Sequence, residues 1–218
     1  MNNTLTWDRT VPLRLLWFYL GLVTTCAGIA MVIKPGIGAA PWDIFHLGVA
    51  GRSGIPLSLV IQLIGVMIIL LDWSLKIRPS IGMVLNMLSV GPILSSILNL
   101  LEVPQTLPGR WLMLAAGVLV FGFGTAMYIS ADMGPGPRDG LMVGLTRRFG
   151  LPVAVIKNGI DVTVALVGWA LGGPLGLGTV IVALSIGPSV QFGMSLIARM
   201  ARLRPFAGFV RPVSLKRS

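Results

Sequence analysis

Two six-residue segments of this chain combine glycine, proline and aspartate in the same order. Glycine favours the end of one helix. Proline is tolerated in the first turn of the next helix because its missing N–H needs no partner there. An acid two residues later lies near the positive end of that helix. Each segment therefore predicts a helix, a break and a second helix. The segments are Gly38-Ala39-Ala40-Pro41-Trp42-Asp43 and Gly134-Pro135-Gly136-Pro137-Arg138-Asp139.

A helix that starts inside a membrane directs free N–H groups and partial positive charge at its surroundings, which suits an anionic ligand. Arg138 adds a full positive charge in one segment only, since Trp42 is its counterpart. In the alternative interpretation, Asp43 and Asp139 cap their own helices and occupy those N–H groups. The glycines and prolines have a structural role in both. The candidate substrate-binding residues of these segments are Gly38, Pro41, Asp43, Gly134, Pro137, Arg138 and Asp139.

Lys157 and Asp161 form a second candidate site, because residues four apart share one face of a helix. They lie in an apolar run, where a charge costs about 2.5–3.5 kcal/mol on insertion scales. A mutual ion pair would lower that cost. The pair could therefore fix helix packing, or Asp161, the deeper residue, could carry a coupling proton or cation.

Gln62 and Asn158 occupy corresponding positions and are the remaining substrate-binding candidates, although hydrogen bonding between helices is the favoured interpretation. His46 has no cysteine or second histidine near it, which makes a metal site improbable. The sequence contains no nucleophile–base motif and no phosphate-binding loop. We therefore expect neither enzyme activity nor a cofactor.

The composition requires these residues to be positioned by membrane helices. Only 11% of the 218 residues are charged, against roughly 25% in soluble domains. Two apolar segments, Ala39–Gly51 and Gly136–Arg148, are too short to span and predict re-entrant helices. The predicted fold is an all-α membrane protein with six transmembrane helices plus these two. The six runs are Leu15–Ile33, Ile55–Leu71, Ile81–Leu101, Trp111–Ile129, Leu151–Leu171 and Gly176–Ile197.

The sequence also contains an internal repeat, which appears when it is shifted by 96 positions, so that Arg14 falls on Arg110. The predicted organisation is an N-terminal segment 1–13, a first repeat 14–101, a second repeat 110–198 and a tail 199–218. Three spans per repeat would give the copies inverted topology. If the short segments also cross, the count becomes eight and the repeats are parallel. Further matched pairs are Pro41 and Pro137, Asp43 and Asp139, Trp73 and Trp169, Gly82 and Gly178, and Pro92 and Pro188.

The net charge of +10 comes from basic residues in short gaps between apolar runs and near the end of the chain. This distribution is typical of the positive-inside bias and places both termini in the cytoplasm. Lys34, Arg52 and Arg110 are exceptions to that orientation. The basic tail could attract anionic lipid. Nucleic-acid binding is not expected.

These motifs resemble the YitT/YczE-type family of bacterial integral membrane proteins. The resemblance implies a location in the bacterial inner membrane and, in function, export of small molecules. Met83 departs from the pattern, since the family and the second copy at Thr179 favour threonine. The matching stretches are 38–46, 134–142, Pro79-Ser80-Ile81-Gly82 with Asn86, 168–173, Gly178-Thr179-Val180 and Gly187-Pro188.

The sequence thus predicts a secondary transporter or exporter of a small molecule that works by alternating access between two inverted repeats. The helix dipoles favour an anionic molecule. A non-transporting membrane scaffold or accessory subunit is the main alternative. A channel or an intramembrane enzyme is a third. The expected partners are membrane lipid and a small-molecule substrate, and the glycine-rich faces could also pair two copies as a homodimer.

Overall fold

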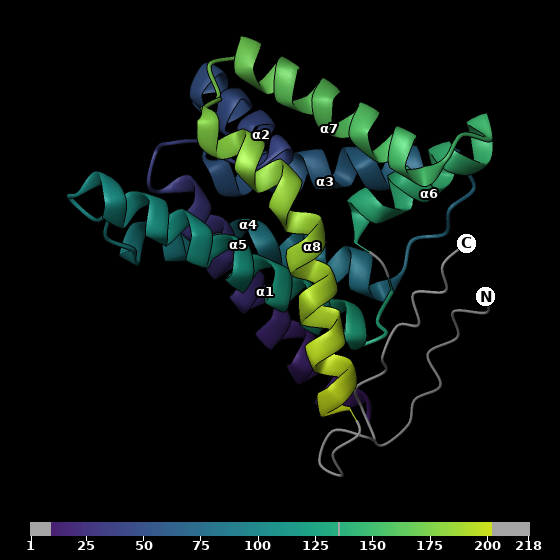
Figure 1. Cartoon of the computed structure of the whole chain (residues 1–218). Coiled ribbons are helices and arrows are strands. Elements are labelled where there is room, and N and C mark those ends of the chain that lie inside the picture. Colours follow the sequence, from purple (N-terminus) through teal and green to yellow (C-terminus); the bar gives the residue numbers. More distant parts are fainter. Residues whose placement is uncertain (1–9, 135, 202–218) are drawn as a thin grey trace.

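The computed structural model describes residues 10–134 and 136–201, and within these ranges all regular structure is helical. This agrees with the all-α prediction. Figure 1 shows the arrangement of the eight helices. Their bounds are α1 (Val11–Ile33), α2 (Pro41–Ser53), α3 (Leu57–Ser74), α4 (Ile81–Leu100), α5 (Leu107–Ser130), α6 (Pro137–Phe149), α7 (Val153–Ala170) and α8 (Leu177–Met200).

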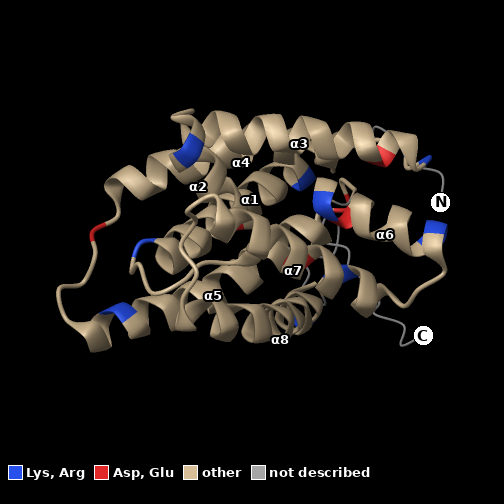
Figure 2. Ribbon diagram, turned by 90° about the horizontal axis from the view of Figure 1, so that it is seen from above, with Lys and Arg blue, Asp and Glu red and all other residues tan. Residues whose placement is uncertain are grey.

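Within the described part of the chain, six helices are long and apolar enough to cross a membrane, namely α1, α3, α4, α5, α7 and α8. They coincide with the six predicted runs, with ends shifted by a few residues. Helices α2 and α6 have 13 residues each, or about 20 Å at 1.5 Å per residue, against a hydrocarbon core of about 30 Å. Charged positions are sparse along the ribbon, apart from a group at the start of α6 (Figure 2). Most of the predicted segments 1–13 and 199–218 lies outside the described residues.

The two short helices have the same local structure. Each begins with a proline in its first turn and ends at a glycine in the left-handed region, Gly54 with φ 69° and Gly150 with φ 67°. A left-handed glycine after the last turn is a common helix end, because it has no Cβ to clash. The predicted pattern of helix, break and short helix is therefore confirmed in both copies.

The helices form two groups. Helices α4, α1, α5 and α8 pack side by side in that order, and we call them the row. Helices α2, α3, α6 and α7 pack in a closed cycle, and we call them the ring. The ring occupies the upper part of Figure 1 and most of the row the lower part. Helix α3 also packs on α4, whereas α7 has no comparable contact with α8.

Glycines bring α1 and α5 together at the centre of the row. Gly21 faces Tyr128 and Gly28 faces Phe121, so residue numbers rise along one helix as they fall along the other. The two helices therefore run antiparallel. A Cβ at Gly28 would overlap the Phe121 backbone. Helix association in lipid depends on close packing rather than on expelling water, so these contacts require glycine.

Two matching backbone hydrogen bonds connect the copies. The Gly82 N–H donates to the Met133 carbonyl and the Gly178 N–H donates to the Ile37 carbonyl, both at 2.9 Å. In each case the start of a long helix, α4 or α8, holds the loop that precedes the short helix of the other copy. The Thr179 hydroxyl adds a contact in one copy only, by accepting from the Ala39 N–H at 3.2 Å. The position of each short helix is therefore set by the opposite copy.

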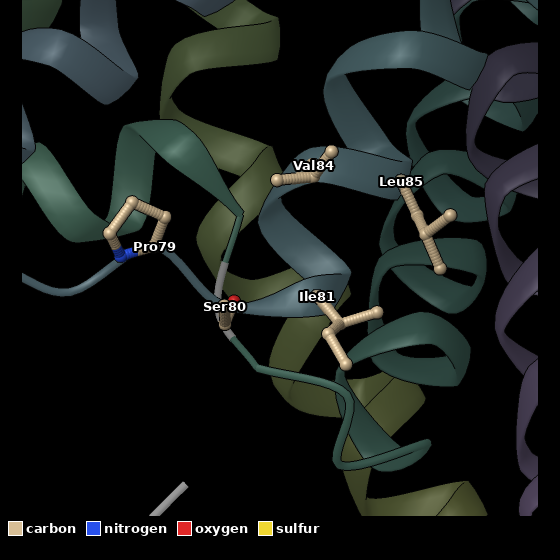
Figure 3. Close-up of a pocket in the computed structure, with 5 residues that line it drawn as sticks. All are labelled: Pro79, Ser80, Ile81, Val84 and Leu85. Atoms are coloured by element: carbon tan, nitrogen blue, oxygen red, sulfur yellow. The ribbon is translucent and has the colours of Figure 1, made fainter.

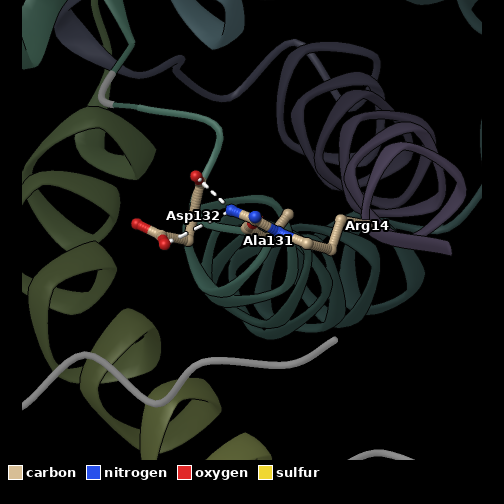
Figure 4. Close-up of polar contacts among 3 residues, drawn as sticks. All are labelled: Arg14, Ala131 and Asp132. Atoms are coloured by element: carbon tan, nitrogen blue, oxygen red, sulfur yellow. Dashed lines mark hydrogen bonds and ion pairs between the residues drawn. The ribbon is translucent and has the colours of Figure 1, made fainter. Parts of the chain in front are cut away.

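Arg14 is buried at the end of α5, just before the break that leads to α6 (Figure 4). Its Nε donates to the Ala131 carbonyl at 2.9 Å, and its Nη2 donates to the Asp132 carbonyl and lies 3.3 Å from the Asp132 carboxylate. A cation here satisfies carbonyls that have no partner within the helix and complements the negative helix end. Arg14 thus ties α1 to the loop before α6.

Candidate functional site

A cavity of about 390 Å³ lies between the ring and the row, and residues from all eight helices line it. Pockets of roughly 300–1,000 Å³ are typical of small-molecule sites. Most of its wall is apolar, with a few charged and polar groups. Six predicted site residues line it: Pro41, Pro137, Arg138, Asp139, Lys157 and Asp161.

The cavity lies where the two copies meet. Positions separated by 96 residues line it from both copies, so each copy contributes an equivalent part of the wall. The first turns of α2 and α6 both take part. Matching pairs include Pro41 and Pro137, Trp42 and Arg138, Ile64 and Ile160, and Val90 and Ile186.

Arg138 is the cation that the cavity leaves available. Its guanidinium carbon lies 4.9 Å from the centre of the Trp42 ring, a cation–π contact between equivalent positions of the two copies. The two ion pairs found in the described chain involve other residues. A planar guanidinium held on an aromatic face keeps its donors free for a carboxylate or phosphate.

The first-turn aspartates differ from one another. The Asp139 carboxylate accepts a hydrogen bond from the Gly136 N–H at 3.1 Å. Asp139 therefore caps its own helix, as the alternative to a substrate-binding role predicts. Asp139 still faces the cavity, close enough to Arg138 and Lys157 for electrostatic interaction. Asp43 is only 4% exposed and does not line the cavity. The equivalent acids therefore have different surroundings.

Lys157 and Asp161 form an ion pair of 2.6 Å within α7, and both line the cavity. The Lys157 side chain is 53% exposed and that of Asp161 is 24% exposed. The predicted pair therefore exists, with the acid as the more buried member. Because Lys157 is already neutralised, Arg138 is the lining cation without a carboxylate at ion-pair distance.

Two polar atoms at the cavity wall are buried without a hydrogen-bond partner: the Nδ1 of His46 and the hydroxyl of Thr125. Buried polar atoms normally have partners, and unpartnered atoms at a cavity often mark where a ligand or water binds. Tyr128 and Asn86 also line this wall. Sequence reasoning did not select Thr125 or Tyr128, because a single polar residue in an apolar helix forms no pattern.

The other predicted residues lie outside the cavity wall. Gln62 donates to the Leu88 carbonyl of α4 at 3.1 Å, a contact between helices, and Asn158 is exposed. Gly38 and Gly134 lie in the break loops with φ of 151° and 106°. A Cβ at either would overlap the start of α8 or Ser80, which precedes α4, so their role is structural.

A second depression of about 260 Å³ lies beside the start of α4 (Figure 3). Four of its five lining side chains are apolar, none is charged, and Ile81 is half exposed. It lacks the convergent polar groups that give a site specificity. The five residues are Pro79, Ser80, Ile81, Val84 and Leu85.

Six apolar helices around an interior cavity define a multi-pass α-helical membrane protein. Residues 12–195 match a family described as a family of unknown function (DUF6198). The chain is 36% identical over 176 residues to an "uncharacterized protein" of Haemophilus influenzae, covering 81% of each chain. It is 30% identical over 188 residues to the "uncharacterized membrane protein YczE" of Bacillus subtilis, covering 85% of this chain and 87% of the relative.

The chain therefore belongs to this family of YczE-type membrane proteins, which confirms the family predicted from the motifs. No solved structure matches the chain.

The contact between Arg138 and Trp42 is measurable by a double-mutant cycle of Arg138→Gln and Trp42→Leu in thermal or denaturant unfolding. We expect a coupling free energy of about 0.5–2 kcal/mol, because a partly desolvated cation over an indole is worth that much. Arg138→Gln with Trp73→Leu is the matched control and should be additive, since Trp73 is 68% exposed on α3. Additivity in both cycles would rule out the contact.

Proposed function

We propose that the protein is a secondary transporter or exporter of a small molecule that carries an anionic group. The observation that carries this proposal is the cavity between the copies, to which both contribute equivalent walls and one contributes the free guanidinium of Arg138. Transporters built from repeats with broken helices bind substrate at such an interface. A rigid scaffold has no need of an interior cavity with unpartnered polar atoms.

The proposed topology is two inverted repeats. Antiparallel packing of α1 and α5, which are equivalent spans, supports opposite orientations of the copies. Helices α2 and α6 would then be re-entrant from opposite sides, which their length of 13 residues supports. The bacterial inner membrane with both termini cytoplasmic is part of the same proposal.

The proposed mechanism is alternating access, and an asymmetry between the copies supports it. Gly65 and Gly91 of the first copy are buried, Gly65 against Met87 of α4 and Gly91 against Ser58 of α3. The counterpart of Gly91 is Gly187, which is exposed and has open space beside it. Helices α7 and α8 both line the cavity without packing together, whereas α3 and α4 pack. Exchanging these two arrangements would open the cavity on the other side.

The proposed substrate follows from the charges and the wall. Asp139 caps its helix, Asp161 neutralises Lys157, and Arg138 is left for an anion. Apolar and aromatic side chains make up most of the remaining surface, including Phe121. An organic acid with an apolar body fits this combination better than an inorganic ion, because its apolar part would otherwise stay in water.

Inverted topology predicts that equivalent positions face opposite sides of the membrane. We expect single cysteines at Ser53 and Phe149, placed in a Cys26→Ala background, to react with an impermeant maleimide from opposite sides of oriented vesicles. These positions end α2 and α6. Labelling from the same side would establish parallel repeats and remove the basis for the symmetric exchange.

Alternating access predicts two crosslinks that exclude one another. A Cβ at Gly65 lies 3.4 Å from that of Met87, which suits a disulfide. Gly65→Cys with Met87→Cys should therefore crosslink quickly under oxidation, in a Cys26→Ala background. The equivalent pair Asp161→Cys with Ala183→Cys should crosslink more slowly, because it requires the other state. Complete failure of the second pair while the first reacts fully would contradict the exchange.

Transport predicts binding and flux of organic acids. We expect a panel of aliphatic and aromatic carboxylates and phosphate esters to contain compounds that raise the melting temperature of the purified protein and show counterflow in proteoliposomes. Arg138→Gln should weaken their binding at least tenfold, or about 1.4 kcal/mol, by removing the anion's partner. Arg52→Gln is the matched control, because Arg52 lies exposed at the end of α2. No binding across the panel, together with a stoichiometric co-purifying protein, would favour the scaffold.

A further inference from the structure

Asp72 is a buried acid that no sequence pattern singled out. It lies in the last turn of α3, is 0% exposed, and neither carboxylate oxygen has a hydrogen-bond partner among the described residues. Two other acids of the ring differ in this respect, since Asp139 accepts a hydrogen bond and Asp161 is ion-paired. A buried, unpartnered carboxyl in a membrane protein calls for a functional explanation.

Helices α4, α6 and α2 pack on α3. The titratable residues of α2 are Asp43, His46 and Arg52. On α6, a Cβ at Gly140 would overlap the Asp72 carboxylate, so the two helices touch at this point. The Met83 side chain of α4 ends beside the same glycine, and α4 carries no titratable residue. Asp139 of α6 is the charged group with an appreciable electrostatic interaction with Asp72, and it is of like sign. The other charged residues of α6 are Arg138, Arg147 and Arg148.

Helix packing alone does not account for this acid. The equivalent residue in the second copy is Gly168, which packs directly against the backbone of Ile44 and Phe45 in α2. The same helix contact is thus made in the second copy without a side chain. In the first copy a carboxyl group fills the position, although an apolar residue of similar size would avoid burying a polar group.

The burial of Asp72 beside α6 makes its charge state relevant to the packing of that helix. An ionised carboxylate buried without a partner is strongly unfavourable, and the repulsion from Asp139 adds to the cost. The neutral acid is therefore the form that matches the packed arrangement of α3 and α6. Loss of the proton favours a conformation in which α6 has moved and Asp72 meets water. Because α6 also carries Arg138 and Asp139, such a movement changes the cavity.

We propose that Asp72 is a proton-binding site whose occupancy controls the docking of α6 and thereby couples a proton to the opening of the cavity. This inference rests on the proposed transporter function and deepens it by naming the coupling ion and its residue. In the coupled step, the Asp72 carboxylate takes a proton from the aqueous side to which it is open, and α6 then packs over the neutral acid. Release to the other side follows the opposite movement.

The first test measures whether the Asp72 carboxyl is protonated, and it needs no substrate. Dicyclohexylcarbodiimide, an apolar reagent, modifies carboxyl groups in their protonated form. We expect mass spectrometry of the full-length protein in lipid vesicles to find the adduct on Asp72 at neutral pH and to lose it at alkaline pH. The exposed acid Asp132 and the ion-paired Asp161 serve as internal controls and should stay unmodified at neutral pH. Absence of the adduct at every pH would overturn the proposal.

The second test measures whether the charge state of Asp72 changes access to the cavity. A cysteine replaces Ala183 at the cavity wall in a Cys26→Ala background, and its alkylation rate is compared with that of the same protein carrying Asp72→Asn. The ratio of the two rates at one pH cancels the titration of the thiol itself. We expect a ratio near one at acid pH, where both side chains are neutral, and a severalfold change at alkaline pH. A flat ratio would overturn the proposal.

Two further outcomes separate this inference from the function on which it rests. If the ratio of alkylation rates does not change with pH but Asp161→Cys and Ala183→Cys crosslink, proton control by Asp72 is refuted and the proposed transporter function is unaffected. A pH-dependent ratio without that crosslink would leave the proton site and remove alternating access. If Asp72→Asn does not fold, Asp72→Glu should shift the pH at which the rate changes, and an unchanged midpoint would count against the site.

Discussion

The structure depends on one constraint, which is that the backbone groups left open where an apolar helix breaks must find partners elsewhere in the protein. The chain meets this constraint twice by the same means. The loop before α2 is held by Gly178 at the start of α8, and the loop before α6 is held by Gly82 at the start of α4. Each copy thus holds the break of the other, and the two copies interlock. The cavity lies between the copies that are joined in this way.

The two copies share the same arrangement of helices, and the charged and aromatic groups of the cavity lie at positions where the copies differ. Trp42 opposes Arg138, and these unlike residues form the cation–π contact at the cavity. Gly65 packs α3 against α4, whereas its counterpart Asp161 holds Lys157. The first copy thus contributes mainly apolar wall and close helix contacts. The second copy contributes the ionisable groups of α6 and α7, and its α7 does not pack on α8 as α3 packs on α4.

Local signals in the sequence were sufficient for the helices and their breaks. Apolar runs of spanning length and proline after glycine act within a few residues, so these elements and the positions of Arg138 and Lys157 followed directly. The sequence could not show which side of an apolar helix faces the protein interior, because lipid and protein interior favour the same side chains. Gln62 and Asn158 therefore turned out to lie outside the cavity wall, and Thr125 was missed. The burial of Asp72 depends on contacts across 68 positions to Gly140, which no local pattern encodes.

The two equivalent helices α3 and α7 each carry one acid at a position where the other has glycine. Asp72 corresponds to Gly168, and Asp161 corresponds to Gly65. Seven residues separate positions 65 and 72, so both positions fall on one face of the helix, two turns apart. Each glycine packs closely on a neighbouring helix, whereas Asp161 lies at the cavity in its ion pair and Asp72 is buried beside Gly140. The two acids therefore lie at the helix contacts whose exchange we propose, at positions where the copies differ.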